Sequence, residues 1–139
     1  DDLRLLVNQE NYVAVNNALA VDLGGQACSE SFGPAMYTGT GGQTVFTITA
    51  AYSNPGRSVI VTPSTAVVDG ERISRIVPIL EAGSVVTAQR AFVDYVVTEF
   101  GIASLKGKSL RQRASALLEV SHPEFQPELK KQAEQIYHI

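Results

Sequence analysis

The strongest constraint on the fold is a change of pattern along the chain. The first hundred residues form short segments rich in Val, Ile and Thr, separated by Gly, Pro, Asn and Asp. Such segments predict strands joined by turns. The last third carries two amphipathic helix patterns instead. Strands followed by helices predict an α/β domain with a layered mixed sheet and flanking helices, and 139 residues suit one such core.

The strand segments and turns can be placed along the chain. We predict strands over 13–21, 57–62, 73–80, 85–87 and 93–98, with Pro78 interrupting the third. Turn residues at 22–26 predict a hairpin into 27–32. Residues 53–56 form a second turn, and 67–71 form a loop that turns at Asp69-Gly70. Residues 1–12 are a polar lead-in, which leaves 13–139 as the domain.

Two helices are predicted after residue 108. Ser109 caps the first, and Gln112 completes a capping box at the third helical position. Its apolar face consists of Leu110, Ala114, Leu117 and Leu118, and it ends at His122-Pro123. The second helix begins near Pro127 and has an inner stripe of Leu129, Ala133, Ile136 and Tyr137.

Three glycines stand within four residues at Gly39, Gly41 and Gly42. Glycine builds no core, but it lets the backbone turn sharply or approach a ligand closely. Free N–H groups in such a loop can face an anion or a developing oxyanion. Two interpretations stay open, a tight turn between two elements and a ligand loop. The cluster is neither a P-loop nor a dinucleotide fingerprint, since the residues that follow do not fit either motif.

Residues 44–53, directly after the glycines, carry conflicting signals. The run Thr44–Thr49 has strand propensity. However, Phe46, Thr49, Ala50 and Ser53 share one face of a helix. A helix beginning here would direct its first amide groups toward a bound anion.

Composition excludes several classes of protein. The net charge of −3 argues against a nucleic-acid partner. A single cysteine, Cys28, excludes an internal disulfide framework, fits a reducing, cytoplasmic compartment and is expected to be a buried thiol. No apolar run is long enough to span a membrane. No His, Cys, Asp or Glu pair has metal-ligand spacing, so we expect no metal.

A few polar residues are candidates for chemistry. Asn16 and Asn17 lie in an apolar segment, either at a bulge or strand end or with an amide directed at a ligand. Glu99 lies at a strand end, as an ion-pair partner of an Arg or Lys or as an active-site carboxylate. His122 and His138 are expected at the surface or in helix caps. A basic run is either a solvated helix start or a phosphate contact; it comprises Lys106, Lys108, Arg111 and Arg113.

Several segments together resemble the acetyl-CoA hydrolase/transferase family. Where that family has Ile-Asn-Ser-Ala-Leu-Glu-Val-Asp-Leu-Thr-Gly-Gln, this chain has Val15–Gln26. The further segments follow in the family's order: Gly39–Phe46, Gly56–Ile60 through Pro63–Ala66, Ser74–Pro78, Tyr95–Ala103 and Gly107–Ala114, ending at His122-Pro123. Because six motifs occur in order between about Val13 and Phe125, the resemblance is far more specific than any one motif.

The resemblance implies a fold and a reaction. Such enzymes have two related α/β domains with the active site between them, and this chain resembles most of the second. They move CoA between carboxylic acids, or hydrolyse the thioester, through a glutamyl-CoA thioester. The resemblance makes Gly41 and Gly42 the oxyanion donors and coenzyme A, as acyl-CoA, the substrate. It also places a set of residues around CoA, namely Asn16, Asn17, Gly39, Gly41, Gly42 and Gln43.

The chain departs from the family in three places. The family's catalytic glutamate lies in an upstream His-Ser-Glu-Met-like segment, and nothing in this chain resembles it. Val45 replaces a usual Asp, and Phe100 replaces a usual Tyr. We therefore expect an N-terminal partner domain to supply the nucleophile and an apolar face to favour oligomers. The other class is a non-catalytic domain that binds CoA or a partner.

Overall fold

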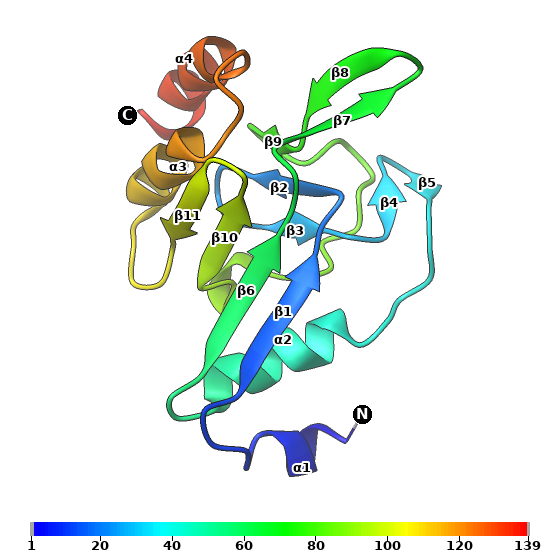
Figure 1. Ribbon diagram of the computed structural model, residues 1–139, viewed down its shortest axis with the longest axis vertical. Coiled ribbons are helices and arrows are strands. Elements are labelled where there is room, and N and C mark those ends of the chain that lie inside the picture. Colours follow the sequence, from blue (N-terminus) through cyan, green and yellow to red (C-terminus); the bar gives the residue numbers. More distant parts are fainter. Residues whose placement is uncertain (1, 139) are drawn as a thin grey trace.

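A computed structural model describes residues 2–138, and its main sheet is mixed (Figure 1). The four strands lie in the order β1-β6-β10-β11, of which the first three are parallel and β11 is antiparallel to β10. Their bounds are Val13–Asn17 for β1, Arg57–Val61 for β6, Tyr95–Thr98 for β10 and Gly101–Ser104 for β11. The predicted α/β class is confirmed, as are the strands at 57–62 and 93–98.

Three smaller sheets lie at the carboxyl ends of β1 and β6 (Figure 1). The first has the order β3-β2-β9, with β2 at Ala20–Asp22, β3 at Ala27–Cys28 and β9 at Ile76–Val77. The predicted hairpin through 22–26 is confirmed, because β2 and β3 pair antiparallel across it, but its second strand ends at Cys28 instead of running to residue 32. The other two are hairpins: β4 (Ser31–Phe32) with β5 (Ala35–Met36), and β7 (Thr65–Val68) with β8 (Glu71–Ser74).

Helices cover one side and one end of the main sheet. The bounds are Leu3–Leu6 for α1, Gln43–Tyr52 for α2, Arg90–Phe92 for the 3-10 helix η1, Leu110–Glu119 for α3 and Gln126–Tyr137 for α4. Helix α2 packs on β1 and β6, whereas α3 packs on β11 and α4. The core between these layers includes Val21, Leu23, Ile60, Val96, Leu105 and Leu117, all fully buried.

The helix caps follow the sequence prediction. Ser109 Oγ accepts from the Gln112 amide at 3.3 Å, and the Gln112 side chain accepts from the Ser109 amide at 2.9 Å. Buried residues include Ala114 and Leu117 in α3 and Leu129 and Ala133 in α4. Two residues of the predicted faces are instead exposed, Leu110 and Ile136, which lie at the first position of α3 and the next-to-last position of α4.

Three strand predictions are wrong in their bounds. The segment 13–21 is two strands in different sheets, since the chain leaves β1 after Asn17 and re-pairs as β2. The segment 73–80 divides at Arg75 into the end of β8 and the short β9. Residues 85–87 form no strand: the Val85 amide donates to Ser31 Oγ at 2.9 Å. An isolated antiparallel bridge joins the next residue, Ala88, to Ala27.

The predicted loop at 67–71 is a β-hairpin. Its turn is Asp69-Gly70, as expected, with φ of 50° and 82°. Positive φ at both central residues matches the twist of flanking strands, so β7 and β8 pair directly across the turn.

The conflict at 44–53 is decided in favour of a helix. The β-branched run forms α2, which lies in the connection between the parallel strands β1 and β6. Parallel strands need such a crossover, and burial of Thr49 and Ala50 against the sheet overrides strand propensity. The Thr47 and Thr49 hydroxyls donate to carbonyls one turn back, at 2.7 and 2.8 Å, so these buried groups are paired within the helix.

One face of the main sheet is left uncovered. Residues on the α2 side, such as Ala14, Ser58 and Val96, are buried. On the other side Val15 is 64% exposed and Ile102 is 69% exposed. We call this side the open sheet face; its apolar members are Val13, Val15, Val59, Val61, Val97 and Ile102.

Candidate functional site

The glycine cluster lies in the loop that leads from β5 into α2 (Figure 1). Gly42 is the N-cap of α2 with φ of −81°, and none of the three glycines has positive φ. A Cβ atom built on Gly39 or Gly41 would meet no atom of the described chain within 4 Å. The loop joins β5 to α2, as a turn would. At Gly39 and Gly41, however, neither the backbone conformation nor the packing of the described chain requires glycine.

This loop presents unused hydrogen-bond donors. Among residues 2–138, no protein acceptor lies within hydrogen-bond distance of the amides of Gly41, Gly42 or Gln43. The side-chain Nε2 of Gln43 is also buried without a partner in the described chain. Amides at the start of a ten-residue helix carry partial positive charge, so they favour an anion or a developing oxyanion.

A buried carboxylate that sequence reasoning missed holds this loop. Glu30 is 4% exposed, and its Oε2 accepts from the Thr40 hydroxyl at 2.8 Å. Its carbonyl accepts from the amides of Tyr37 and Thr38, at 2.8 and 3.1 Å. Glu30 therefore anchors both the entry and the centre of the loop. No sequence signal marks it, because it lies between two serines in a short turn region.

Asn16 and Asn17 end β1 and point to opposite faces of the sheet. The strand-end interpretation is thus confirmed. Asn17 is exposed and lines a pocket at the carboxyl end of β1. Asn16 lies on the α2 side, and its Nδ2 is buried with no acceptor among the described residues. Only Asn17, among the six residues that the resemblance places around CoA, lines this pocket.

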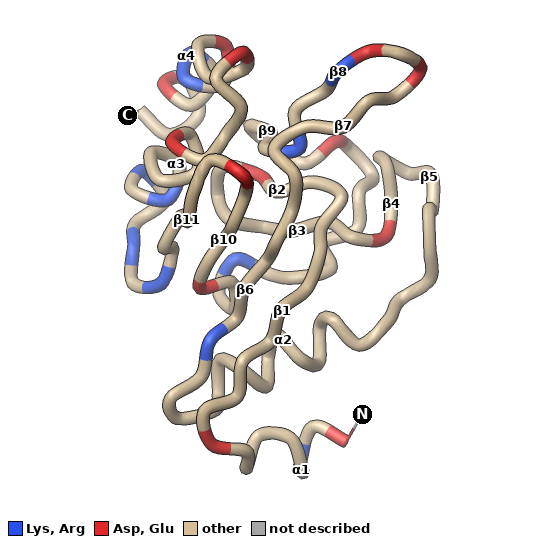
Figure 2. The backbone as a smooth tube through the Cα atoms, in the orientation of Figure 1, with Lys and Arg blue, Asp and Glu red and all other residues tan. Residues whose placement is uncertain are grey.

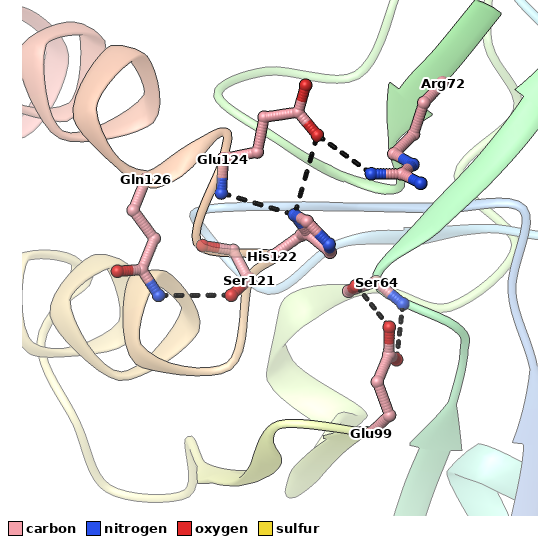
Figure 3. A network of polar contacts seen from close by, with 7 residues as sticks. All are labelled: Ser64, Arg72, Glu99, Ser121, His122, Glu124 and Gln126. Atoms are coloured by element: carbon pink, nitrogen blue, oxygen red, sulfur yellow. Dashed lines mark hydrogen bonds and ion pairs between the residues drawn. The ribbon is translucent and has the colours of Figure 1, made fainter.

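Glu99 is held by a single neighbour, Ser64 (Figure 3). Its carboxylate accepts from the Ser64 amide at 2.8 Å and from the Ser64 hydroxyl. Burial raises the pKa of this carboxyl, but the donors from Ser64, with the amide of Glu99 itself and the nearby His122, outweigh it and hold the pKa below its ordinary value. In the described chain Glu99 forms no ion pair with an Arg or Lys, so the expected ion-pair partner is replaced by Ser64.

His138 lies in a helix cap, as the sequence predicts, whereas the His122 side chain is only 24% exposed and caps no helix. The His122 ring is stacked edge-on against Phe100, with centroids 5.3 Å apart, and its Nδ1 accepts from the Glu124 amide at 3.2 Å (Figure 3). Glu124 in turn pairs with Arg72 at 3.1 Å. His138 is the C-cap of α4 in a left-handed conformation. Cys28 is a buried free thiol, as expected.

The basic run lies on the opposite side of the molecule from the glycine loop (Figure 2). Arg113 donates to the carbonyls of Lys108 and Arg90 at 3.1 and 2.9 Å, and burial lowers the pKa of its guanidinium. Lys106 lies 3.8 Å from the buried Asp94. These contacts support the interpretation of the basic run as a helix start, in which Arg113 and Lys106 contact the preceding segments of the chain.

Two negative findings apply to the described residues. In 2–138, no group of three or more His, Cys, Asp or Glu side chains has the arrangement to hold a metal ion. None of the helices within that range is long and apolar enough to cross a membrane.

Comparison with known proteins decides the family. The sequence pattern of the acetyl-CoA hydrolase/transferase C-terminal domain matches residues 2–133. The chain belongs to this family. It is 49% identical over 130 residues to the succinyl-CoA:cyclohexane-1-carboxylate CoA transferase of Geobacter metallireducens, covering 94% of this chain and 29% of that protein. It is 46% identical over 125 residues to the 4-hydroxybutyrate coenzyme A transferase of Clostridium kluyveri, covering 90% of this chain and 29% of that protein.

Solved structures agree with this membership of the acetyl-CoA hydrolase/transferase family. The crystal structure of RipA from Yersinia pestis matches 99% of this chain and 30% of its own, with a TM-score of 0.87 and 39% identity. The 4-hydroxybutyrate CoA-transferase of Porphyromonas gingivalis matches 96% of this chain and 29% of its own, with a TM-score of 0.71 and 37% identity. The chain thus spans about three tenths of the length of these relatives.

Proposed function

We propose that this domain holds the thioester end of an acyl-CoA in an enzyme that transfers CoA between carboxylic acids or hydrolyses the thioester. The observation that carries the proposal is the glycine loop. Gly41 and Gly42 offer free amides ahead of α2, and Gly39 and Gly41 leave open space where side chains would stand. Space and donors together suit the close approach of a ligand carbonyl.

The reaction implied by the family follows from these donors. A glutamate carboxylate attacks the acyl-CoA carbonyl, and the carbonyl oxygen takes the negative charge while it accepts from Gly41 and Gly42. The CoA thiolate leaves as an anhydride forms. The thiolate then attacks the glutamyl carbonyl, giving glutamyl-CoA and releasing the first acid. The remaining contacts around CoA are proposed for Asn16, Asn17, Gly39 and Gln43.

The nucleophilic glutamate is proposed to come from an N-terminal domain that packs on the open sheet face. A parallel sheet is normally covered on both sides, because its strands are apolar on both. Here Val15 and Ile102 are exposed on the uncovered side. Relatives more than three times as long leave ample chain to cover it. The division into a lead-in over residues 1–12 and a domain from residue 13 stays a prediction.

Two further proposals concern the state of the protein in the cell. The open sheet face supports a homo-oligomer wherever the N-terminal domain does not cover it fully. The buried, unpaired thiol of Cys28 supports a reducing, cytoplasmic compartment.

The test uses the full-length protein and the 139-residue chain in parallel. Each is mixed with a panel of acyl-CoA donors, with and without acetate, and free CoA and new acyl-CoA are measured. Mass spectrometry then searches for a glutamyl-CoA adduct. We expect turnover and an adduct with the full-length protein, and neither with the 139-residue chain, because no catalytic glutamate segment is present in it.

The result also separates a transferase from a hydrolase, and either enzyme from a non-catalytic domain. Formation of a new acyl-CoA with acetate supports a transferase, whereas release of free CoA regardless of acetate supports a hydrolase. Binding of CoA without turnover or adduct in the full-length protein would replace the enzyme with a non-catalytic CoA-binding domain.

A further inference from the structure

A pocket of about 510 Å³ lies at the carboxyl ends of β1 and β6. Its walls come from five separate parts of the chain, namely Asn17–Leu19, Ser29, Tyr37, Val61 with Pro63, and Arg75. Asn17 and Val61 are direct partners in the parallel register, so the pocket continues the edge at which the open sheet face ends. Ligands of open α/β sheets bind at this edge, and the volume is in the range of small-molecule sites.

Arg75 is the charged residue of this pocket. Its Nη1 donates to the Ala18 carbonyl at 3.0 Å, while its Nε is buried with no acceptor in residues 2–138. None of the ion pairs in that range involves Arg75. A guanidinium with an unused donor and no carboxylate is unusual, because leaving such a group unpaired costs free energy. The planar fork of arginine matches a carboxylate.

The backbone holds Arg75 in place from both sides. Its amide donates to the Ser64 carbonyl at 2.8 Å, and its own carbonyl accepts from the Val21 amide at 2.8 Å. Ser64 is in turn fixed by the Glu99 carboxylate (Figure 3). The backbone of Arg75 is thus fixed by β2 and, through Ser64, by Glu99 just after β10, and the Ala18 carbonyl holds the guanidinium, as a preorganised binding group requires.

The remaining walls are apolar or neutral. Leu19, Val61 and Pro63 supply apolar surface, and Ser29 Oγ is already used as a donor to the Asn17 carbonyl at 2.8 Å. One cation beside an apolar wall fits a small acid: the carboxylate pairs with the guanidinium, and the hydrocarbon chain contacts Leu19, Val61 and Pro63.

We propose that this pocket binds the free short-chain carboxylate substrate and that Arg75 is its carboxylate-binding residue. The inference rests on the proposed function, since it names the site at which the acid without CoA is held. Its position where β1 and β6 end places the acid at the boundary with the proposed N-terminal domain.

The test measures binding and turnover separately in the full-length protein. Butyrate is the probe, and butyramide is its uncharged counterpart. We expect butyrate, but not butyramide, to raise the melting temperature. In Arg75→Gln the butyrate shift is lost, and the KM for the carboxylate acceptor rises about 10- to 100-fold. The KM for acyl-CoA stays within about twofold, since Arg75 contacts the other substrate. Arg75→Lys keeps the charge but not the fork, and gives an intermediate KM.

Arg72→Gln is the matched control, because Arg72 is exposed and paired with Glu124 outside the pocket. It should match the parent protein in every assay. The proposal is overturned if Arg75→Gln raises the KM for acyl-CoA instead, if butyramide binds as well as butyrate, or if a folded Arg75→Lys keeps the parent KM. If the protein turns over no acyl-CoA, the proposed function fails, but the butyrate and butyramide shifts still decide the pocket.

Discussion

At the scale of single residues, the Glu99–Ser64 pair has a predictable pH dependence. The folded-state pKa of Glu99 lies below its ordinary value of 4.5, because two donors from Ser64, the amide of Glu99 itself and the nearby His122 together outweigh the burial that raises it. A lowered carboxyl pKa stabilises the fold above the ordinary value, and this contribution disappears as the pH falls through the folded value. Acid should therefore loosen Ser64, and with it the segment that supports Arg75.

We predict that Ser64→Ala makes the free energy of unfolding less dependent on pH below 4.5. Without the hydroxyl donor, the Glu99 pKa moves back toward its ordinary value. Urea unfolding between about pH 6 and about pH 3 measures this slope. Ser115→Ala, at an exposed position of α3, is the control and should keep the parent slope. Equal slopes for Ser64→Ala and the parent protein would show that the pair does not couple to folding.

At the scale of one element, helix α2 is flanked by two glycines, Gly56 after it and Gly41 before it, and their surroundings differ. A Cβ on Gly56, after the helix, would overlap the Ala50 carbonyl oxygen, which cannot move without disturbing α2. A Cβ on Gly41, before the helix, would meet no described atom within 4 Å. The first glycine is therefore needed by the fold and the second is free to serve a ligand.

We predict that alanine at Gly56 lowers stability, whereas alanine at Gly41 lowers turnover. Gly56→Ala should lower the free energy of unfolding by about 1–3 kcal/mol. Gly41→Ala should change it by less than about 0.5 kcal/mol. In the full-length protein Gly41→Ala should reduce kcat about 100-fold, because the added methyl group displaces the reacting carbonyl. Thermal unfolding combined with steady-state kinetics separates the effects. Unchanged kcat in a stable Gly41→Ala protein would remove the loop from the proposed site.

At the scale of the whole molecule, the open sheet face is the surface through which we expect the chain to associate. Val15 and Ile102 lie on β1 and β11, the two edge strands, so their exposed side chains mark the two sides of an apolar surface. Apolar surface of this extent drives association when nothing covers it. The proposed N-terminal domain and self-association therefore compete for one face.

We predict that the 139-residue chain is a dimer or larger, and that Val15→Lys with Ile102→Lys makes it a monomer. Light scattering measures the mass across a range of concentrations. Val67→Lys is the control, since Val67 is 71% exposed in the β7–β8 hairpin, away from this face, and should leave the association unchanged. A parent chain that stays monomeric at high concentration would contradict the prediction.

The sequence by itself determined the features that depend on neighbours in the chain. The capping box of Ser109 and Gln112 closes within one helical turn, and the turns at 22–26 and Asp69-Gly70 depend on local backbone conformation. The ordered motifs also identified the family. For these features the deciding interactions lie within a few residues, so the local pattern is sufficient.

Only the tertiary structure decided the rest. Residues 43–52 form a helix despite their β-branched residues, because the parallel pair β1 and β6 needs a crossover that buries Thr49 and Ala50. Residues 85–87 fail to form a strand, since their amides bond to Ser31 and Ala27 instead. The pocket joins Asn17 to Arg75 across 58 positions of sequence. Burial and pairing between distant segments set these outcomes, and no local pattern encodes them.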